Sequence, residues 1–176
     1  MKNNYYYLIA SLSMLQFGMK PPISYQNFLE ECARTLSQDE ADALKEGRTF
    51  LLKRWGDFDK ALRNELVRTR AVKIGKDPDN YLRANEGIDP FIAPLTHWAA
   101  NHGSPMEAEK YMDKIRWEKI EEFKAGHYFD MEYLAAYGLQ LQILERWDRI
   151  DSGDGMKILE GLAPRQKASP VKAGMN

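Results

Sequence analysis

The stretch from Asp130 to Ile150 constrains the fold more than any other part of the chain. Its large apolar side chains recur at intervals of three and four residues, at Leu134, Tyr137, Leu141, Leu144 and Trp147. That interval is the period of one face of an α-helix. Further apolar residues widen the face, so we expect a helix that is buried on more than one side and capped by Asp130. Such a helix needs other helices around it.

A second helix is predicted directly before this one. The run Ser104-Pro105-Met106-Glu107 combines an N-cap, a proline at the first helical position and a capping-box glutamate. The helix should extend to about Ala125, and Gly126 should end it. Because the connection to the next helix is short, the two are expected to form an antiparallel hairpin, with Leu141 and Leu144 nearly fully buried. Trp117 departs from the main apolar face, which indicates a second contact surface.

The rest of the chain reads as further short helices. Ser24 should cap a helix over residues 25–36, and Ser37-x-x-Glu40 is a capping box for the next one. Gly56 and Asp57 predict a break between an apolar segment at 49–55 and a helix at 58–74. Shorter helices are expected near 79–85, 90–101 and 156–162, while residues 5–15 fit either a helix or a buried strand. We therefore predict an all-α helical bundle, with a single domain over residues 1–162 and a disordered tail over 163–176.

Composition is that of a globular protein, with 44% hydrophobic and 29% charged residues. The single cysteine, Cys32, excludes an internal disulfide framework and reads best as a small buried side chain. No segment approaches the roughly 18 consecutive apolar residues of a membrane span. The tyrosines and serines that follow Lys2 make a poor signal peptide, so a cytoplasmic protein is expected.

No motif in the sequence indicates catalysis. The three histidines, at positions 97, 102 and 127, do not have metal-ligand spacing, and no H-E-x-x-H or C-x-x-C pattern occurs. No glycine-rich phosphate-binding loop is present either. We therefore predict no catalytic, cofactor or metal site, no small-molecule substrate and no enzymatic activity.

A basic segment runs from Lys45 to Lys76. It holds ten basic and four acidic residues, a charge of +6 in a chain whose net charge is −1. Three hypotheses stay open for it: pairing with the acidic C-terminal helix hairpin of the same molecule, binding an acidic protein surface, and binding nucleic acid. Aromatic residues interleave with it only thinly, which disfavours stacking on single strands. The candidate partner-binding residues are Arg54, Arg63, Arg68, Arg70 and Lys73.

Two aromatic and leucine-rich stretches carry a family resemblance. The first comprises YYYLIASL at 5–12, Phe17-Gly18 and Pro21-Pro22; the second comprises GHYFD at 126–130, LAAY at 134–137 and LERW at 144–147. Together they resemble an uncharacterised bacterial family encoded beside V-type ATP synthase subunits. The opening Y-x-Y-L-x-A is also distantly similar to the start of the central-stalk protein of V-type ATPases, the funnel-shaped helical protein that couples the rotating shaft to the membrane ring.

This resemblance implies a function for the chain. It implies a non-enzymatic subunit or accessory factor of a bacterial V-type rotary ATPase, similar to the central-stalk protein and acting by protein–protein contact. Its partners would be ATPase subunits, through which it would be peripheral at the inner membrane, with a role in ion transport. The alternative from the residues alone is a nucleic-acid-binding regulatory protein that uses the basic segment 45–76.

Overall fold

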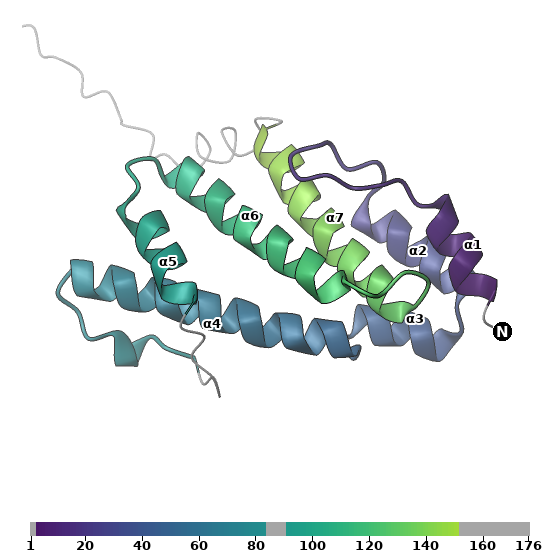
Figure 1. Cartoon of the computed structure of the whole chain (residues 1–176), viewed down its shortest axis with the longest axis horizontal. Helices are drawn as coiled ribbons and strands as arrows, with labels where there is room; N and C mark the ends of the chain where they lie inside the picture. The colour runs from purple at the N-terminus through teal and green to yellow at the C-terminus, as the bar shows by residue number, and fades with distance from the viewer. Residues whose placement is uncertain (1–2, 84–90, 152–176) are drawn as a thin grey trace, which may run out of the picture.

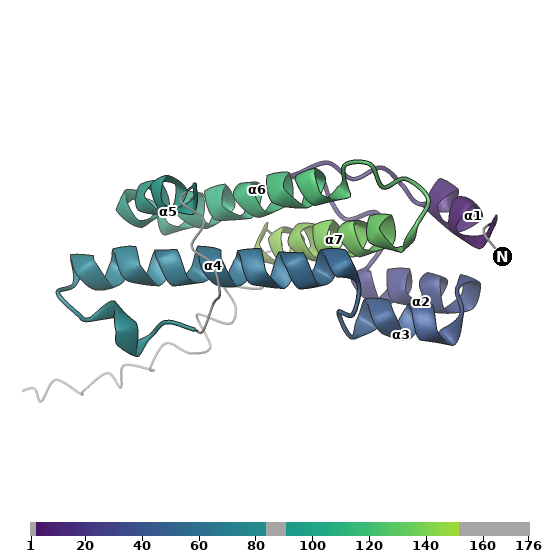
Figure 2. The same ribbon diagram turned by 60° about the horizontal axis from the view of Figure 1, so that its bottom comes forward.

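The computed structural model describes residues 3–83 and 91–151 (Figure 1). All regular structure in these ranges is helical, which confirms the all-α prediction. The elements in chain order are α1 (Asn3–Ser11), α2 (Tyr25–Thr35), α3 (Gln38–Lys45), α4 (Phe50–Lys73), the 3₁₀ helix η1 (Pro78–Asn80), α5 (Ile92–Asn101), α6 (Pro105–Lys124) and α7 (Met131–Asp151). Helices α1, α2 and α3 gather at one end of the molecule and α5 at the other, as Figures 1 and 2 both show.

Helix α7 is the centre of the arrangement. It packs against α2, α3, α4 and α6. Hydrogen bonds join Glu121 of α6 to Gln140 of α7, and Asp113 of α6 to Trp147 of α7. Because the partners follow in opposite order along the two helices, α6 and α7 run in opposite directions. Ten of the 21 residues of α7 are buried, and Leu141 and Leu144 are 0% and 1% exposed, as predicted.

Two apolar clusters fill the interior. The larger one surrounds α7 and receives side chains from every α-helix except α5; its least exposed members include Phe28, Cys32, Leu51, Ile120, Leu134, Ala136, Leu141 and Leu144. The smaller one joins α4, α5 and α6 through Leu62, Ile92, Ala99, Ala108, Met112 and Ile115. The partly buried ring of Phe58 packs against both clusters and connects them. Burial of Cys32 agrees with the sequence interpretation.

The predicted N-caps are in place. The side chains of Ser24, Ser104 and Asp130 accept hydrogen bonds from backbone N–H groups three residues later, at 3.1, 3.3 and 2.9 Å. At the start of α3 the carboxylate of Glu40 accepts from the backbone N–H and the hydroxyl of Ser37, at 3.0 and 2.6 Å. These contacts satisfy N–H groups that a helix leaves unpaired in its first turn, which is why the sequence marks helix starts well.

Helix α7 also supplies carboxylates to the first turns of two other helices. Glu132 accepts the backbone N–H groups of Phe50 and Leu51 at the start of α4, at 3.1 and 2.7 Å. Glu145 accepts the N–H of Tyr25 at the start of α2, at 2.7 Å. Negative charge at a helix N-terminus interacts favourably with the helix dipole. These bonds therefore fix where α2 and α4 begin relative to α7.

The predicted break at Gly56 and Asp57 is wrong. Helix α4 is continuous from Phe50 to Lys73 and passes through both residues. Leu51, Leu62 and the partly buried Phe58 lie in the apolar clusters on either side of the expected break. A glycine in a helix interior costs about 1 kcal/mol relative to alanine, a penalty that this apolar packing on both sides overcomes.

Other expectations are settled in part. Residues 3–11 form a helix, which resolves the choice left open for the N-terminal segment. Trp117 is 7% exposed and packs edge-on against Phe17, with ring centroids 5.7 Å apart. The second contact surface expected at Trp117 is therefore wrong, because its ring lies inside the larger cluster. The predicted helix at 156–162 and the predicted disordered tail at 163–176 lie outside the described residues.

Candidate functional site

The five predicted partner-binding residues all lie on α4 but do not form one surface. Arg63 and Arg70 are seven residues apart and share a face of the helix, whereas Arg54 and Arg68 lie on other faces. Arg54 is exposed, and its guanidinium lies over the rings of Phe50 and Phe123, at 5.5 and 4.4 Å from their centroids. No ion pair joins Arg54 to any residue that the structure describes.

The other four are engaged within the molecule. Arg63 pairs with Asp59 at 2.7 Å, and Arg68 pairs with Glu65 at 3.1 Å. Arg70 approaches Glu109 of α6 at 3.9 Å. Lys73 donates to the backbone carbonyl of Ala100 at the end of α5, at 3.2 Å. Pairing with the C-terminal hairpin, one of the three hypotheses for the basic segment, is thus realised among these five residues only by Arg70, whereas Arg63 and Arg68 pair with acids of α4 itself.

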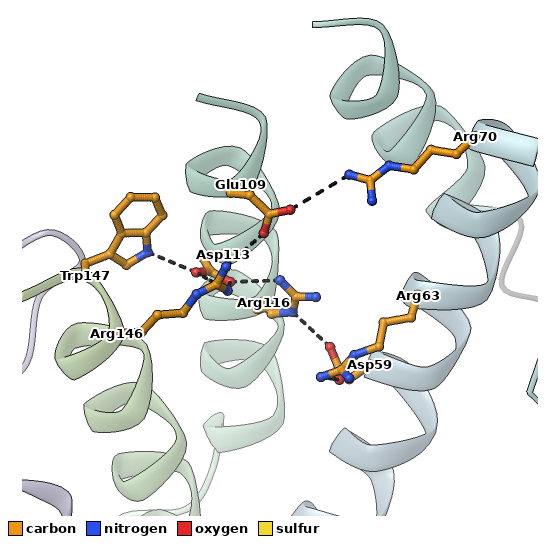
Figure 3. Close-up of polar contacts among 8 residues, drawn as sticks. All are labelled: Asp59, Arg63, Arg70, Glu109, Asp113, Arg116, Arg146 and Trp147. Atoms are coloured by element: carbon orange, nitrogen blue, oxygen red, sulfur yellow. Dashed lines mark hydrogen bonds and ion pairs between the residues drawn. The ribbon is translucent and has the colours of Figure 1, made fainter. Parts of the chain in front are cut away.

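The most developed polar cluster is built around Asp113 of α6, whose side chain is 1% exposed. Its carboxylate accepts from Arg116 Nη1 at 2.8 Å, from Arg146 Nη1 at 3.0 Å and from Trp147 Nε1 at 2.9 Å. Figure 3 shows these side chains converging from α6 and α7. A buried carboxylate is costly unless it is paired and hydrogen-bonded, and three donors meet that requirement here.

The cluster extends from Asp113 to α4. Arg116 also donates through Nε to Asp59 at 2.9 Å, and Asp59 in turn holds Arg63. On the other side Arg146 pairs with Glu109 at 2.9 Å. Burial lowers the pKa of Arg116, but the hydrogen bonds and negative charges of Asp59 and Asp113 outweigh it and leave that pKa raised. The network therefore joins α4, α6 and α7 through ion pairs (Figure 3).

An open groove of about 400 Å³ lies over this network, and we call it the arginine groove. Its polar lining includes Arg63, Arg116, Arg146 and Arg149, with the carboxylates of Asp59, Asp113 and Glu145. Arg63 and Arg146 have side chains 55% and 41% exposed, so both can reach a ligand in the groove. The groove brings one predicted residue, Arg63, together with three arginines that sequence reasoning did not single out.

A second exposed feature lies at the end of the molecule where α1 meets the connection between α6 and α7 (Figure 2). We call it the aromatic end; it comprises Tyr6, Tyr7, Tyr128 and Phe129, which are between 53% and 69% exposed. The rings of Tyr6 and Phe129 lie 5.0 Å apart, and those of Tyr6 and Tyr7 lie 5.8 Å apart. Exposed aromatic groups that gather in this way are typical of protein contact surfaces.

The described residues offer little for catalysis or metal binding. They contain no group of three or more His, Cys, Asp or Glu side chains that could hold a metal ion. Burial raises the pKa of the Cys32 thiol to about 12, so the thiol is protonated at neutral pH. In the same ranges no helix is both long and apolar enough to cross a bilayer.

One comparison with known proteins gives a match. Residues 97–164 match a family described as a protein of unknown function, DUF2764. The matched part is less than half of the chain, and it includes all of α6 and α7 and with them Asp113, Arg116, Arg146 and Trp147. No curated protein and no solved structure matches the chain.

Sequence reasoning missed the Asp113 network for a physical reason. Asp113 lies between the buried Met112 and the charged Lys114, and nothing local marks it as buried. The available signal was spacing: Glu109, Asp113 and Arg116 follow at four and three residues, so they share one face of α6. A polar stripe beside an apolar one is ordinarily solvated, and only the approach of Arg146 and Trp147 from α7 encloses it.

Proposed function

We propose that the protein is a non-enzymatic subunit or accessory factor of a bacterial V-type rotary ATPase and that it acts by protein–protein contact. One observation carries this proposal. The two sequence stretches that resemble the ATPase-associated family, near residues 5–12 and 126–130, are distant in the chain but meet at the aromatic end. Their contact is direct, with the rings of Tyr6 and Phe129 5.0 Å apart.

The exposure of this end supports a role in binding rather than in the core. Tyr7 and Tyr128 are 67% and 69% exposed, so neither side chain is needed to fill the interior. Tyrosine offers a large contact area together with a polar hydroxyl, and aromatic side chains are enriched among the residues that dominate protein interfaces. The aromatic end would therefore bind a component of the ATPase, and through it the protein would be peripheral at the inner membrane.

Nucleic-acid binding has less support as an alternative. Of the predicted basic residues, Arg63, Arg68 and Arg70 have carboxylate partners within the molecule. The basic side chains are also distributed around α4, whereas a phosphate backbone is usually followed by cations on one face.

A pull-down from native membranes tests the proposal. The tagged full chain should retain ATPase subunits, and replacement of Tyr7 and Tyr128 by aspartate should abolish that retention by charging the exposed aromatic end. Val72→Asp is the control, because it charges an exposed apolar side chain away from the aromatic end. Val72 is 73% exposed and lies near the C-terminal end of α4, where α5 packs. Recovery of nucleic acid instead of ATPase subunits, or equal retention by the aromatic-end variant, would refute the proposed function.

A further inference from the structure

We propose that the arginine groove binds a short acidic amphipathic helix of a partner protein. The groove has helical walls, because α4 and α7 form its sides and α6 its floor (Figure 3). Its lining on α7 extends from Leu139 to Arg149, a rise of ten residues or ~15 Å at 1.5 Å per residue. A helix of about three turns matches that length. This surface is separate from the aromatic end, so the two proposals can fail independently.

The charges of the groove favour an acidic occupant. Its carboxylates are already engaged: Asp113 by three donors, Asp59 by Arg63 and Arg116, and Glu145 by the N–H of Tyr25. Arg63 uses one terminal guanidinium nitrogen for Asp59, and more than half of its side chain is exposed. Guanidinium groups donate in a planar fork that matches a carboxylate. Glutamates of a partner would therefore find donors at Arg63, on the α4 wall of the groove.

The apolar part of the lining favours a peptide over a nucleic acid. Trp55 on α4 and Leu139 on α7 are each partly exposed, and the more deeply buried Ile143 lies between Leu139 and Arg146 on α7. An amphipathic helix places apolar side chains at intervals of three and four residues, which suits such a groove. Trp55 is the only aromatic residue in the described lining, so successive bases would have no stacking platform.

The arginines are also held in position before any partner arrives. Asp113 fixes Arg116 and Arg146 from beneath, and Asp59 fixes Arg63 and Arg116. Side chains that are already ordered lose less conformational entropy on binding, which strengthens the complex.

The experiment uses the full chain, labelled with ¹⁵N, and a synthetic 15-residue helical peptide with glutamate on one face and leucine on the other. Titration should shift the indole N–H signal of Trp55 and the Nε–H signal of Arg63 saturably. A matched peptide with lysine in place of each glutamate should shift neither. Arg63→Glu should raise the Kd about tenfold, and added salt should slow association because it screens exposed charges.

Arg34→Glu is the matched control. Arg34 is an exposed arginine on α2 that pairs with Glu30 and Glu31, and its reversal changes the net charge equally without touching the groove. Its Kd should equal that of the wild type. Circular dichroism should show that Arg63→Glu is folded, and Arg63→Gln, which removes charge without reversing it, should give an intermediate Kd.

Three results would overturn the proposal. The first is binding of the acidic peptide that Arg63→Glu leaves unchanged, or no binding at all. The second is displacement of the peptide by a 20-nucleotide single strand whose own binding needs Arg63, which would assign the groove to nucleic acid. The third is concentration-dependent self-association of the free chain that Arg63→Glu abolishes in sedimentation, which would make a second copy the occupant.

Discussion

Asp113→Asn tests the energetic role of the buried network. The substitution preserves volume but replaces one carboxylate oxygen by an amide NH₂ group, which can only donate, facing donors from Arg116, Arg146 and Trp147. Removing one partner of a buried ion pair costs ~3–5 kcal/mol. The loss should lie at the low end of this range, because Arg116 keeps its ion pair with Asp59 and the side chain of Arg146 is 41% exposed to water. We expect a loss of about 3 kcal/mol in the free energy of unfolding.

Urea unfolding followed by circular dichroism measures this loss. With a slope of about 2 kcal/mol per molar urea, the midpoint should fall by about 1.5 M. Asp57→Asn is the control, because Asp57 is 74% exposed and meets Lys60 only at 3.8 Å; its change should stay below ~0.5 kcal/mol. In a double-mutant cycle, Trp147→Phe should show a coupling of at least ~0.5 kcal/mol with Asp113→Asn. A loss below ~1 kcal/mol for Asp113→Asn would refute the reasoning.

Four further outcomes are expected from single sites. Leu141→Ala should lower the free energy of unfolding by ~2–5 kcal/mol, and an unchanged melting temperature would contradict its central burial. Gly56→Ala, into open space, should raise stability by up to ~1 kcal/mol in the same assay. The thiol of Cys32, with a pKa of about 12, should react with an alkylating reagent only after unfolding. Hydrogen bonds from Ser37 and Tyr5 lower the pKa of Glu40, so Glu40→Gln should reduce stability at pH 7 and reduce it progressively less as the pH falls through that lowered pKa.

The fold was predictable where the signal is local. The caps at Ser104 and Asp130 and the stripe through Leu141 depend on residues within a few positions of each other, so the sequence displays them directly. The break predicted at Gly56 was wrong because glycine disfavours a helix by only about 1 kcal/mol, and the apolar packing on either side of it outweighs that penalty. The starts of α2, α3, α6 and α7 were therefore predicted correctly, whereas the start of α4 at Phe50 was missed.

The candidate site was less predictable because its contacts are not local. Arg63 was identified from the charge of its segment, but Asp113 and Trp147 are 34 residues apart in the chain. Their contact depends on the register of α6 against α7, which no spacing within one helix reports. The meeting of Tyr6 with Phe129 likewise needs α1 to lie beside the connection between α6 and α7.

The carboxylates of α7 that accept hydrogen bonds at the starts of α2 and α4 impose an order on folding during synthesis. Tyr25 and Glu145 are 120 residues apart, and Leu51 and Glu132 are 81 apart. Helices α2 and α4 therefore leave the ribosome well before the acids that complete their first turns. At a typical rate of ~5–20 residues per second, α2 waits on the order of ten seconds for Glu145. During that interval its apolar face, including Phe28, lacks the helix that later covers it, so the nascent chain depends on α7 to complete its fold.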